Sequence, residues 1–485
     1  MPLLTKSKYI TGLKCPRYLW MMFHDLDKIP EHDAATLALF RQGNEVGQIA
    51  KKLFPEGVDI PEADFMKNIH LTKDAIDARK MSFEAGIMEG NIYARADMLV
   101  PIEGGEWDIV EVKGSNKIKP EHLHDISFQR HVYQKSGLKI RKCFLIYLNR
   151  DFKKNGEINP EEFFIMEEVT DGVDFASKGI EERIDEMFTI INNKEAPTHI
   201  HIGNKCNNGM KCECDECHSF LPESHVFELY YGGQKSLELL EAEVLTIKDI
   251  PDDFKLTPNQ QIQRECAISG KPHIEKQGIN NFLRKLTYPL YYFDFETFNS
   301  AVPIYEGTKP YQQIPFQFSL HVDDGKEVTH HEYLHDSKED PRRVILDKLK
   351  ATLGTEGSII VYYKPFEIGR LKELAEAFPE EKEWVEGIIS RIVDLMDPFK
   401  KFHYYDPSQK GSCSIKNILP AITGKSYKDL DIGDGSLASV SYYDSVFAEM
   451  SEEEIKKIRD DLLVYCKLDT EGMVWIVDGL KKLTN

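Results

Sequence analysis

The amino-acid sequence predicts an α/β protein with two modules, each a domain that carries candidate catalytic residues, joined by a helical connector. In both halves of the chain, short apolar runs typical of strands alternate with longer segments of helical periodicity. The length of 485 residues suggests two to four domains, each able to bury its own core. The composition is globular, with 41% hydrophobic and 29% charged residues. We assign the modules to residues 1–225 and 286–485 and the connector to 226–285.

Charge and cysteine content narrow the class of protein. The net charge of −20 argues against a passive nucleic-acid coat, which would be basic, but suits a metal nuclease that uses carboxylates. No apolar run reaches the roughly 18 residues of a membrane span, and residues 1–14 lack the apolar region of a signal peptide. Nine unevenly spaced cysteines indicate thiols or metal ligands. We therefore expect a cytoplasmic protein that does not bind membranes.

The first segments of the N-terminal module offer two candidate residues. Cys15 precedes a proline at the start of an amphipathic stretch. A helix is predicted over residues 34–54, where Glu45 lies between two glycines and is either a metal ligand or a surface glutamate. A second helix is predicted over residues 71–85, with Thr72 as its N-cap.

A predicted hairpin carries the chemistry of this module. Two strands, 92–100 and 107–113, flank a Gly-Gly turn in which positive φ costs nothing. Asp97 lies on the first strand, and Glu111 and Lys113 project from one face of the second. Two carboxylates can hold a divalent cation that activates water, and a lysine can stabilise a phosphoryl transition state. The alternative is a half-exposed hairpin whose charges face solvent.

A helix predicted over residues 121–136 follows the hairpin. Gln129 and Tyr133 are four residues apart on it and share a face, where they can bind a phosphate or the catalytic water. The alternative is an ordinary polar helix face. Strands over 140–148 and 163–168 and a helix over 179–193 complete the predicted module.

Four cysteines then fall close together, in the spacing Cys206-x5-Cys212-x-Cys214-x2-Cys217. Thiolates in such a cluster select zinc or an iron–sulfur cluster. The four local cysteines can form a zinc knuckle, or three of them can join the distant Cys15 around a 4Fe-4S cluster. Spacing alone does not decide between these two sites.

In its order of motifs, the segment 1–220 resembles the RecB-type branch of the PD-(D/E)XK nucleases, in the iron–sulfur form of AddB and the CRISPR-adaptation exonucleases. The motifs are Cys15, Asp97, Glu111-Val112-Lys113, Gln129-x3-Tyr133 and a cysteine-rich tail. The resemblance implies a restriction-endonuclease-like domain with Mg²⁺ or Mn²⁺ at Asp97 and Glu111. It implies catalysis by Lys113 with support from Gln129 and Tyr133. Glu45 stands where that family often has a histidine metal ligand.

The same resemblance implies a 4Fe-4S cluster that staples the two ends of the nuclease domain together. Its ligands here would be Cys15, Cys206, Cys212 and Cys217, with Cys214 as the spare. The sequence departs from the family in one respect, because the wide gap between the C-terminal cysteines comes first and the close pair last. Zn²⁺ remains the alternative occupant.

The C-terminal module opens with an apolar strand that ends in acid, at residues 288–297. Asp294 and Glu296 are two apart and share a face suited to a common metal; the alternative is a strand edge with two solvated acids. A strand over 359–363 leads into a helix that carries Glu367. On a long helix predicted over 452–476, Tyr465 and Asp469 again share a face.

These motifs resemble the DnaQ-like exonucleases of the DEDDy type, which have an RNase H-like fold. The match covers roughly residues 286–485, with Glu367 standing where the family's second motif has aspartate; Asp394 is the fallback ligand. The resemblance implies two-metal hydrolysis, with the cations held by Asp294, Glu296, Glu367 and Asp469. It also implies that Tyr465 orients the attacking water, as a general base or as its helper. Ser412, Ser414 and Lys416 are candidate phosphate contacts, although a capped helix start explains them nearly as well.

Together the two resemblances lead us to expect a bifunctional metal-dependent nuclease of an uncharacterised bacterial two-nuclease family. The second site should digest 3′ to 5′, and DNA, as single strands or ends, is the expected substrate in repair or processing, with RNA as the alternative. No P-loop is present, because Leu419 stands where the motif around Gly424-Lys425-Ser426 needs glycine, so unwinding requires a helicase in trans. The competing interpretations are a nucleic-acid-binding scaffold that retains nuclease folds and a zinc-containing ribonuclease.

Overall fold

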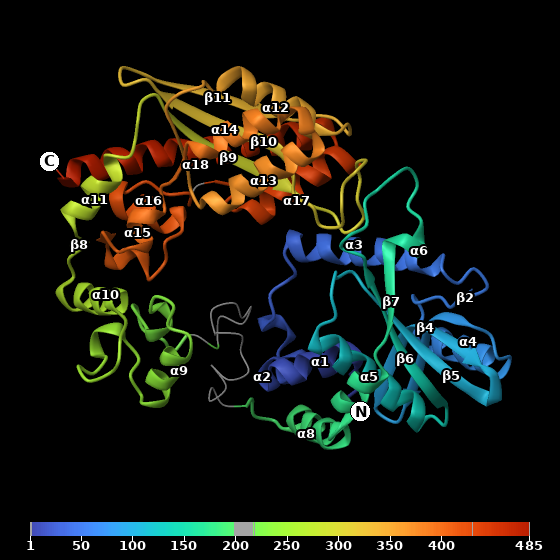
Figure 1. The fold of residues 1–485 in the computed structure, drawn as a ribbon. Coiled ribbons are helices and arrows are strands. Elements are labelled where there is room, and N and C mark those ends of the chain that lie inside the picture. The colour runs from blue at the N-terminus through green and yellow to red at the C-terminus, as the bar shows by residue number, and fades with distance from the viewer. Residues whose placement is uncertain (1, 198–216, 218, 429, 485) are drawn as a thin grey trace. The chain divides into compact units, whose positions relative to one another are not determined.

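The computed structural model describes residues 2–197, 217, 219–428 and 430–484. The chain divides into two compact units, which are treated separately below (Figure 1). The first contains Met1–His218 and Ser300–Gln312, and the second contains Ser219–Asn299 and Gln313–Asn485. Each unit combines helices with a β-sheet, which confirms the predicted α/β class. Among the described helices, none combines the length and apolar character that crossing a membrane requires.

The first unit is built on a seven-stranded sheet in the order β2-β3-β4-β5-β6-β7, with β1 paired to β4. Its strands are β1 (Leu4–Thr5), β2 (Val58–Asp59), β3 (Ser82–Glu89), β4 (Ile92–Ile102), β5 (Glu106–Lys113), β6 (Lys139–Leu148) and β7 (Phe164–Glu168). Its helices are α1 (Lys6–Lys14), α2 (Pro16–His24), α3 (Ala34–Lys51), α4 (Phe65–Asp77), α5 (Pro120–Lys135), α6 (Pro160–Phe163), α7 (Thr170–Ser177) and α8 (Ile180–Asn192).

The predicted hairpin is present as the antiparallel pair β4 and β5, with Met98 opposite Val110. Gly104 and Gly105 form the turn at φ of 80° and 84°, where a side chain would strain the backbone. The predicted helix after the hairpin is α5, which begins with a proline in its first turn and ends before Gly137. The two-residue period of the strands and the glycine pair of the turn therefore predicted this part of the fold correctly.

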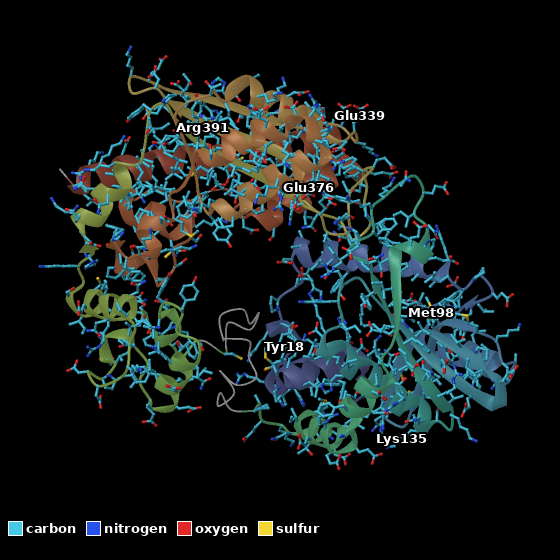
Figure 2. The ribbon with its side chains drawn as sticks, viewed as in Figure 1. Tyr18, Met98, Lys135, Glu339, Glu376 and Arg391 are labelled. Atoms are coloured by element: carbon cyan, nitrogen blue, oxygen red, sulfur yellow. The ribbon has the colours of Figure 1, made fainter. Side chains whose placement is uncertain are left out.

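The two faces of this sheet bury different sets of side chains. On one face, Ile109 of β5 and Leu145 of β6 pack with Phe128 of α5. On the other, Val46 of α3 packs with Met98 of β4, which is labelled in Figure 2. Because side chains alternate along a strand, the face that buries Ile109 also receives Glu111.

The segment Ser300–Gln312 completes the second of these cores, although it follows β9 of the other unit in sequence. Ala301 is fully buried in that core, and its backbone N–H donates to Oε1 of Gln42 at 3.0 Å. The hydroxyl of Tyr311 donates to the carbonyl of Gly114, the residue after Lys113. The core of the first unit thus includes residues from far along the chain.

The helix predicted over residues 71–85 is wrong at both ends. Helix α4 begins at Phe65, because Asp64 accepts a hydrogen bond from the backbone N–H of Lys67 at 3.0 Å and caps it. Thr72, predicted as the cap, is buried in mid-helix, where its hydroxyl accepts from the N–H of Gly86 at 2.9 Å. The last four residues of the predicted helix, 82–85, belong to β3.

The second unit contains a five-stranded sheet in the order β11-β10-β9-β12-β13. These strands are β9 (Leu290–Phe298), β10 (Ile314–Asp323), β11 (Val328–Leu334), β12 (Ser358–Val361) and β13 (Ile392–Asp394), and β8 (His273–Ile274) pairs with β14 (Tyr404–Tyr405) outside this sheet. The helices are α9 (Gln234–Glu241), α10 (Pro258–Ser269), α11 (Lys276–Leu283), α12 (Pro341–Thr352), α13 (Lys364–Ala377), α14 (Lys382–Ser390), α15 (Asp397–Lys400), α16 (Ile415–Thr423), α17 (Gly435–Phe447) and α18 (Glu452–Thr484). The residues predicted as a connector belong to this unit.

Strand β9 lies in the middle of the sheet and is covered on both sides. Its odd-numbered residues, such as Phe293 and Phe295, pack in a core with α12, α13 and α14. Helix α18 lies against β9 and β10 on the other side, where Ser319 of β10 hydrogen-bonds Thr470 at 2.7 Å. Ser319 is paired with Asp294, so the even-numbered acids of β9 face α18.

Candidate active sites

Two acids of β9 meet α18 in the second unit. Glu296 is 7% exposed and Asp294 is half-buried. The fully buried Cys466 of α18 places its thiol 4.0 Å from Oδ2 of Asp294. One ligand atom from each of these three residues lies within 4.8 Å of the other two, which is compact enough to surround one cation.

Asp469, one turn of helix after Tyr465, adds a third carboxylate to this group. It is 7% exposed and accepts a hydrogen bond from the hydroxyl of Tyr427 at 2.7 Å. Burial raises the pKa of Asp469 to about 6, although the hydroxyls of Tyr427 and Tyr465 act to lower it. Burial, and then the charge of Asp469, also raises the pKa of Tyr465 far above its usual value. Tyr465 is therefore a protonated phenol at neutral pH.

Glu367 is the fourth acid, in the first turn of α13 after β12. Only 1% of it is exposed, and its Oε2 has no hydrogen-bond partner. Burial, followed by the charge of Asp394, raises its pKa to about 8. Asp394 itself accepts hydrogen bonds from the backbone N–H groups of Tyr363 and Lys364, at 3.0 and 3.1 Å, and so caps α13. The fallback ligand thus has a structural role.

The four acids form a cluster whose negative charge no paired cation neutralises. Within the described part of the chain, none of Asp294, Glu296, Glu367 and Asp469 has an ion-pair partner within 4.0 Å. Two cations act on the cluster without pairing with it. Lys416 of α16 lies 5.7 Å from the ring centre of Tyr465 and lowers the pKa values of Glu296 and Asp469. Arg370 of α13 acts to lower the pKa of Glu367. Burial and the neighbouring carboxylates nevertheless raise the pKa values of Asp294 and Glu296. An oxygen-rich donor set with excess negative charge suits a hard divalent cation.

The candidate site of the first unit differs because its acids are paired with lysines. Glu111 is 1% exposed, and its Oε1 lies 2.7 Å from Nζ of Lys113 and 2.8 Å from Nζ of Lys6. Burial alone would raise the pKa of Glu111, but the two lysines outweigh it and lower that pKa. The acids around Lys113 in turn raise the pKa of its ammonium group against the effect of burial. Both partners are therefore charged at neutral pH.

Helix α5 adds Gln129, which binds Glu111 directly, and Asp125, an acid that the sequence analysis missed, which binds Gln129 and Lys113. The amide of Gln129 donates to Oε2 of Glu111 at 2.8 Å and to Oδ1 of Asp125 at 3.0 Å. Asp125 also lies 2.5 Å from Nζ of Lys113. The carbonyl oxygen Oε1 of Gln129 is buried without a partner, so it can accept a hydrogen bond from a bound water.

Asp97 lies beside this group on β4. Its Oδ2 accepts a hydrogen bond from the backbone N–H of Val112 at 2.7 Å, which fixes it next to Glu111. Burial, followed by the charge of Glu111, raises the pKa of Asp97 to about 7. The structure therefore brings Asp97, Glu111, Lys113 and Gln129 together, as the sequence analysis expected.

Tyr133 and Glu45 have other surroundings than expected. Tyr133 is fully buried, and its hydroxyl donates to the carbonyl of Ala85 and accepts from the N–H of Ala96 at 3.0 Å. The predicted contact of Tyr133 with phosphate or water is corrected, because its hydroxyl is already bonded to β3 and β4 and so positions Asp97. Glu45 is exposed on α3, and no hydrogen bond or ion pair in the described residues links it to Asp97 or Glu111.

The predicted cysteine cluster lies partly outside the described residues, which leave out Cys206, Cys212 and Cys214. Cys15 caps the N-terminus of α2, where its Sγ accepts from the N–H of Tyr18 at 3.3 Å. Cys217 packs in one cluster with Trp20 of the same helix, next to Tyr18, which is labelled in Figure 2. Two of the four predicted ligands are thus associated with one helix.

Sequence reasoning missed four residues of these sites. Asp125 had a usable signal, since it precedes Gln129 by four residues on the same helix face. Lys6 had none, because it reaches its site only through long-range packing, and for Tyr427 and Cys466 no local signal shows that the side chain contacts an acid of the cluster.

Comparisons with known proteins find relatives without an assigned role. Residues 291–414, which include Asp294, Glu296 and Glu367, match a domain of unknown function, DUF2779. An uncharacterised protein of Ureaplasma parvum is 31% identical over 229 residues, which are 43% of this chain and 33% of that protein. An uncharacterised protein of Mycoplasma genitalium is 28% identical over 218 residues, which are 41% of this chain and 32% of that protein. The matched region thus spans about a third of the length of these relatives.

Among solved structures, the one titled "Crystal structure of SSO0001" is similar over 40% of this chain and 87% of its own. Its sequence identity is 14% and its TM-score is 0.17, a likeness too slight to carry an argument. The functional interpretation therefore rests on the geometry of the two sites.

Proposed function

We propose that this chain is a bifunctional, metal-dependent nuclease that hydrolyses phosphodiester bonds at both sites. The observation that carries the proposal is the convergence of three buried acids and the half-buried Asp294, from β9, α13 and α18, with no lysine or arginine paired to them in the described structure. A protein gains nothing in stability from such a cluster, because like charges brought out of water repel each other. Divalent cations relieve that repulsion.

The sheet of the second unit supports an RNase H-like exonuclease domain. Numbered along the chain, its strands run 3-2-1-4-5, with the second antiparallel to the first, which is the order expected of that fold. The first and fourth strands lead to Asp294 and Glu367, and α18 supplies Asp469. We take these three residues, with Glu296, as the ligands for Mg²⁺ or Mn²⁺. The orphaned Oε2 of Glu367 and the oxygen donors around it fit such ions.

A bound divalent ion supplies a water of lowered pKa and neutralises charge on the phosphate oxygens. The residues of the chain then have separate tasks. Tyr465 keeps its proton, so it orients the attacking water by hydrogen bonding and does not serve as the base. Tyr427 holds Asp469 in place by its 2.7 Å hydrogen bond. Lys416, the nearby cation, attracts the negatively charged substrate.

In the first unit, we propose a PD-(D/E)XK nuclease site with Asp97 and Glu111 as ligands for Mg²⁺ or Mn²⁺. Lys113 stays positively charged and can stabilise the developing negative charge on a phosphate. Gln129 fixes Glu111 and offers its free Oε1 to a water. Because Lys6 and Lys113 already neutralise Glu111, this site should bind cations more weakly than the four-acid cluster does.

We also propose that a 4Fe-4S cluster, with Zn²⁺ as the alternative, ties the ends of the first unit together. Its ligands would be Cys15, Cys206, Cys212 and Cys217. The chain that leads into the cysteine-rich segment is anchored beside Cys15, since Trp20 of α2 donates to the carbonyl of Asn193 at 2.9 Å. The N-terminus of α2 also favours a negatively charged thiolate.

Digestion of single strands tests the proposal. DNA and RNA labelled at either end would be incubated in Mg²⁺ or Mn²⁺ with wild type, Lys113→Ala, Asp294→Ala and the double variant. We expect separable losses, with 3′-end digestion missing in Asp294→Ala and a second activity missing in Lys113→Ala. The substrate that is cut decides between DNA and RNA. Absence of cleavage by wild type would refute the nuclease proposal and favour a binding scaffold.

A further inference from the structure

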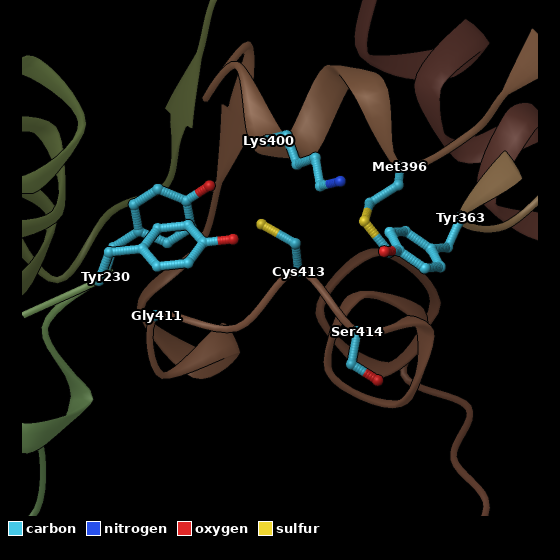
Figure 3. A pocket seen from close by; sticks show the side chains of 8 residues that line it. Tyr230, Tyr363, Met396, Lys400, Gly411, Cys413 and Ser414 are labelled. Atoms are coloured by element: carbon cyan, nitrogen blue, oxygen red, sulfur yellow. The ribbon is translucent and has the colours of Figure 1, made fainter. Parts of the chain in front are cut away.

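A second feature of the C-terminal unit is a pocket of about 340 Å³. Figure 3 shows Tyr230 on one side of it and Tyr363 on the other, with Cys413 between them and Lys400 beside them. Tyr231 and Ser414 also line it. The volume is at the lower end of the roughly 300–1,000 Å³ of small-ligand sites, so the pocket suits a single nucleoside and excludes a duplex.

The chemistry of the lining selects an aromatic ligand that carries negative charge. Three tyrosines and a lysine contribute to it, and no acidic residue does. Nζ of Lys400 lies 5.0 Å from the ring centre of Tyr363 and has no carboxylate partner in the described structure. A base that stacks on a tyrosine and a phosphate that pairs with the lysine would satisfy both groups.

Two of the tyrosines are held in positions that cost free energy. Tyr231 is 82% exposed and Tyr363 is 47% exposed, although burial of an aromatic ring is favourable. Both have left-handed backbones, with φ of 46° and 76°, which bulky residues rarely adopt. Strain of this kind persists where the surroundings impose it, and it gathers at ligand sites.

The wall that carries Tyr230 and Tyr231 is fixed from behind by α10. Oε1 of the buried Gln263 accepts from the N–H of Tyr230 at 2.7 Å. The amide of the buried Gln260 donates to the carbonyl of Tyr230 at 2.8 Å. The pocket is therefore preorganised, and little freedom is lost when a ligand binds. This assigns a task to the segment between the two predicted modules, in which the sequence shows no chemistry.

The pocket and the four-acid cluster share two elements. Tyr363 directly precedes α13 and stands four residues before Glu367, about 6 Å along a helix axis. Ser414 directly precedes α16, which carries Lys416 toward Tyr465. A nucleic-acid strand that places one nucleotide in the pocket therefore has its neighbouring phosphate within reach of the four-acid cluster.

We propose that this pocket binds one nucleotide of a single-stranded nucleic acid, with the base on the tyrosines and the phosphate at Lys400, and so presents the strand to the four-acid cluster. The inference rests on the proposed function for the identity of the ligand, but it concerns binding and can be tested without cleavage.

The test is binding of a fluorescein-labelled 15-nucleotide single strand, of deoxythymidine or of uridine, followed by fluorescence anisotropy in EDTA. We expect Tyr231→Ala and Tyr363→Ala each to weaken binding about ten-fold or more, since stacking contributes roughly 1–3 kcal/mol per base. Tyr231→Phe keeps the ring and should bind as wild type does. Lys400→Ala should reduce the salt dependence by about 0.7 in the logarithmic slope, the value for one phosphate of a single strand. A hairpin duplex should bind more weakly than the single strand.

Phe175 provides a matched control, because it is 73% exposed on α7 with Nζ of Lys178 lying 5.0 Å from its ring centre. Phe175→Ala should leave the affinity unchanged. Wild-type affinity in both tyrosine variants, or no binding by wild type, would overturn the proposal that the pocket binds a nucleotide. Hydrolysis of the small ester thymidine 5′-(4-nitrophenyl phosphate) by wild type but not by Asp294→Asn tests the cluster alone. Pocket-dependent binding without this hydrolysis would therefore refute the nuclease site at the four-acid cluster and leave the pocket standing.

Discussion

Replacing Glu367 by glutamine should stabilise the metal-free protein at alkaline pH. The pKa of Glu367 is raised from the ordinary 4.5 to about 8, first by burial. Because the pKa is higher in the folded state, the folded protein binds this proton more tightly than the unfolded chain does. The stabilisation from that proton is complete below pH 4.5 and is lost as the pH rises to about 8. Glutamine carries no charge, so it avoids this loss.

The size of the effect follows from the same shift. A rise of the pKa from 4.5 to about 8 corresponds to about 5 kcal/mol between acid and alkaline pH. Oε2 of Glu367 has no partner, so a glutamine amide in its place stays unsatisfied, at a cost of about 1–3 kcal/mol. The net gain at pH 9 is then about 2–4 kcal/mol. For a unit of this size, the unfolding midpoint would rise by about 5–15 °C.

Calorimetric unfolding of wild type and Glu367→Gln in EDTA, between pH 5 and pH 9, measures this difference. Glu381→Gln is the matched control, because Glu381 is also buried, at 6% exposed against 1% for Glu367, but lies 2.6 Å from Nζ of Lys350. It should lose a few degrees at neutral pH. Addition of Mn²⁺ should raise the midpoint of wild type and of Glu381→Gln, and raise that of Glu367→Gln much less.

Two results would refute this reasoning. A difference between wild type and Glu367→Gln that stays constant from pH 5 to pH 9 would show that Glu367 is not held in a repulsive environment. An equal response of Glu367→Gln and wild type to Mn²⁺ would show that Glu367 is not a ligand.

Three further predictions concern the other groups. Lys113→Ala should abolish the first activity while circular dichroism stays unchanged, because Lys6 still neutralises Glu111 from 2.8 Å; full activity would remove Lys113 from the site. First-site activity should fall as the pH drops below about 7, since Asp97 then gains a proton and loses its affinity for the metal; a flat profile in the presence of limiting Mn²⁺ would argue against Asp97 as a ligand. Cys15→Ala should bleach the visible absorbance of protein purified without oxygen and lower its unfolding midpoint. A colourless wild type that contains zinc would replace the cluster by a zinc site.

Local signals in the sequence predicted the parts of the sites that lie on single elements. The two-residue period of β5 placed Glu111 beside Lys113, and the helical period of α5 placed Gln129 on the face that contacts Glu111. The glycine pair set the hairpin between β4 and β5. These features need only the geometry of one strand, one helix and one turn.

Long-range packing decided the rest, and no local pattern reports it. Lys6 reaches Glu111 because β1 adds to the sheet beside β4, a parallel pairing of residues about 90 positions apart. The hydroxyl of Tyr133 has the same helical spacing whether it faces a substrate or the backbone of Ala85. The boundary between α4 and β3 was missed because residues 71–85 show helical periodicity, whereas Ser82–Glu89 gains its hydrogen bonds from β4.

The passage of Ser300–Gln312 into the first unit affects how this protein is made. A ribosome releases the chain from its N-terminus, so the apolar face of β5 and β6 that Ala301 covers stays open until residue 312 has emerged. By then β9 has also been synthesised. The first unit therefore cannot complete its core until residues 219–299 of the second unit have been synthesised. A fragment cut at residue 225 would keep that face exposed, so point substitutions separate the two activities more safely than truncation does.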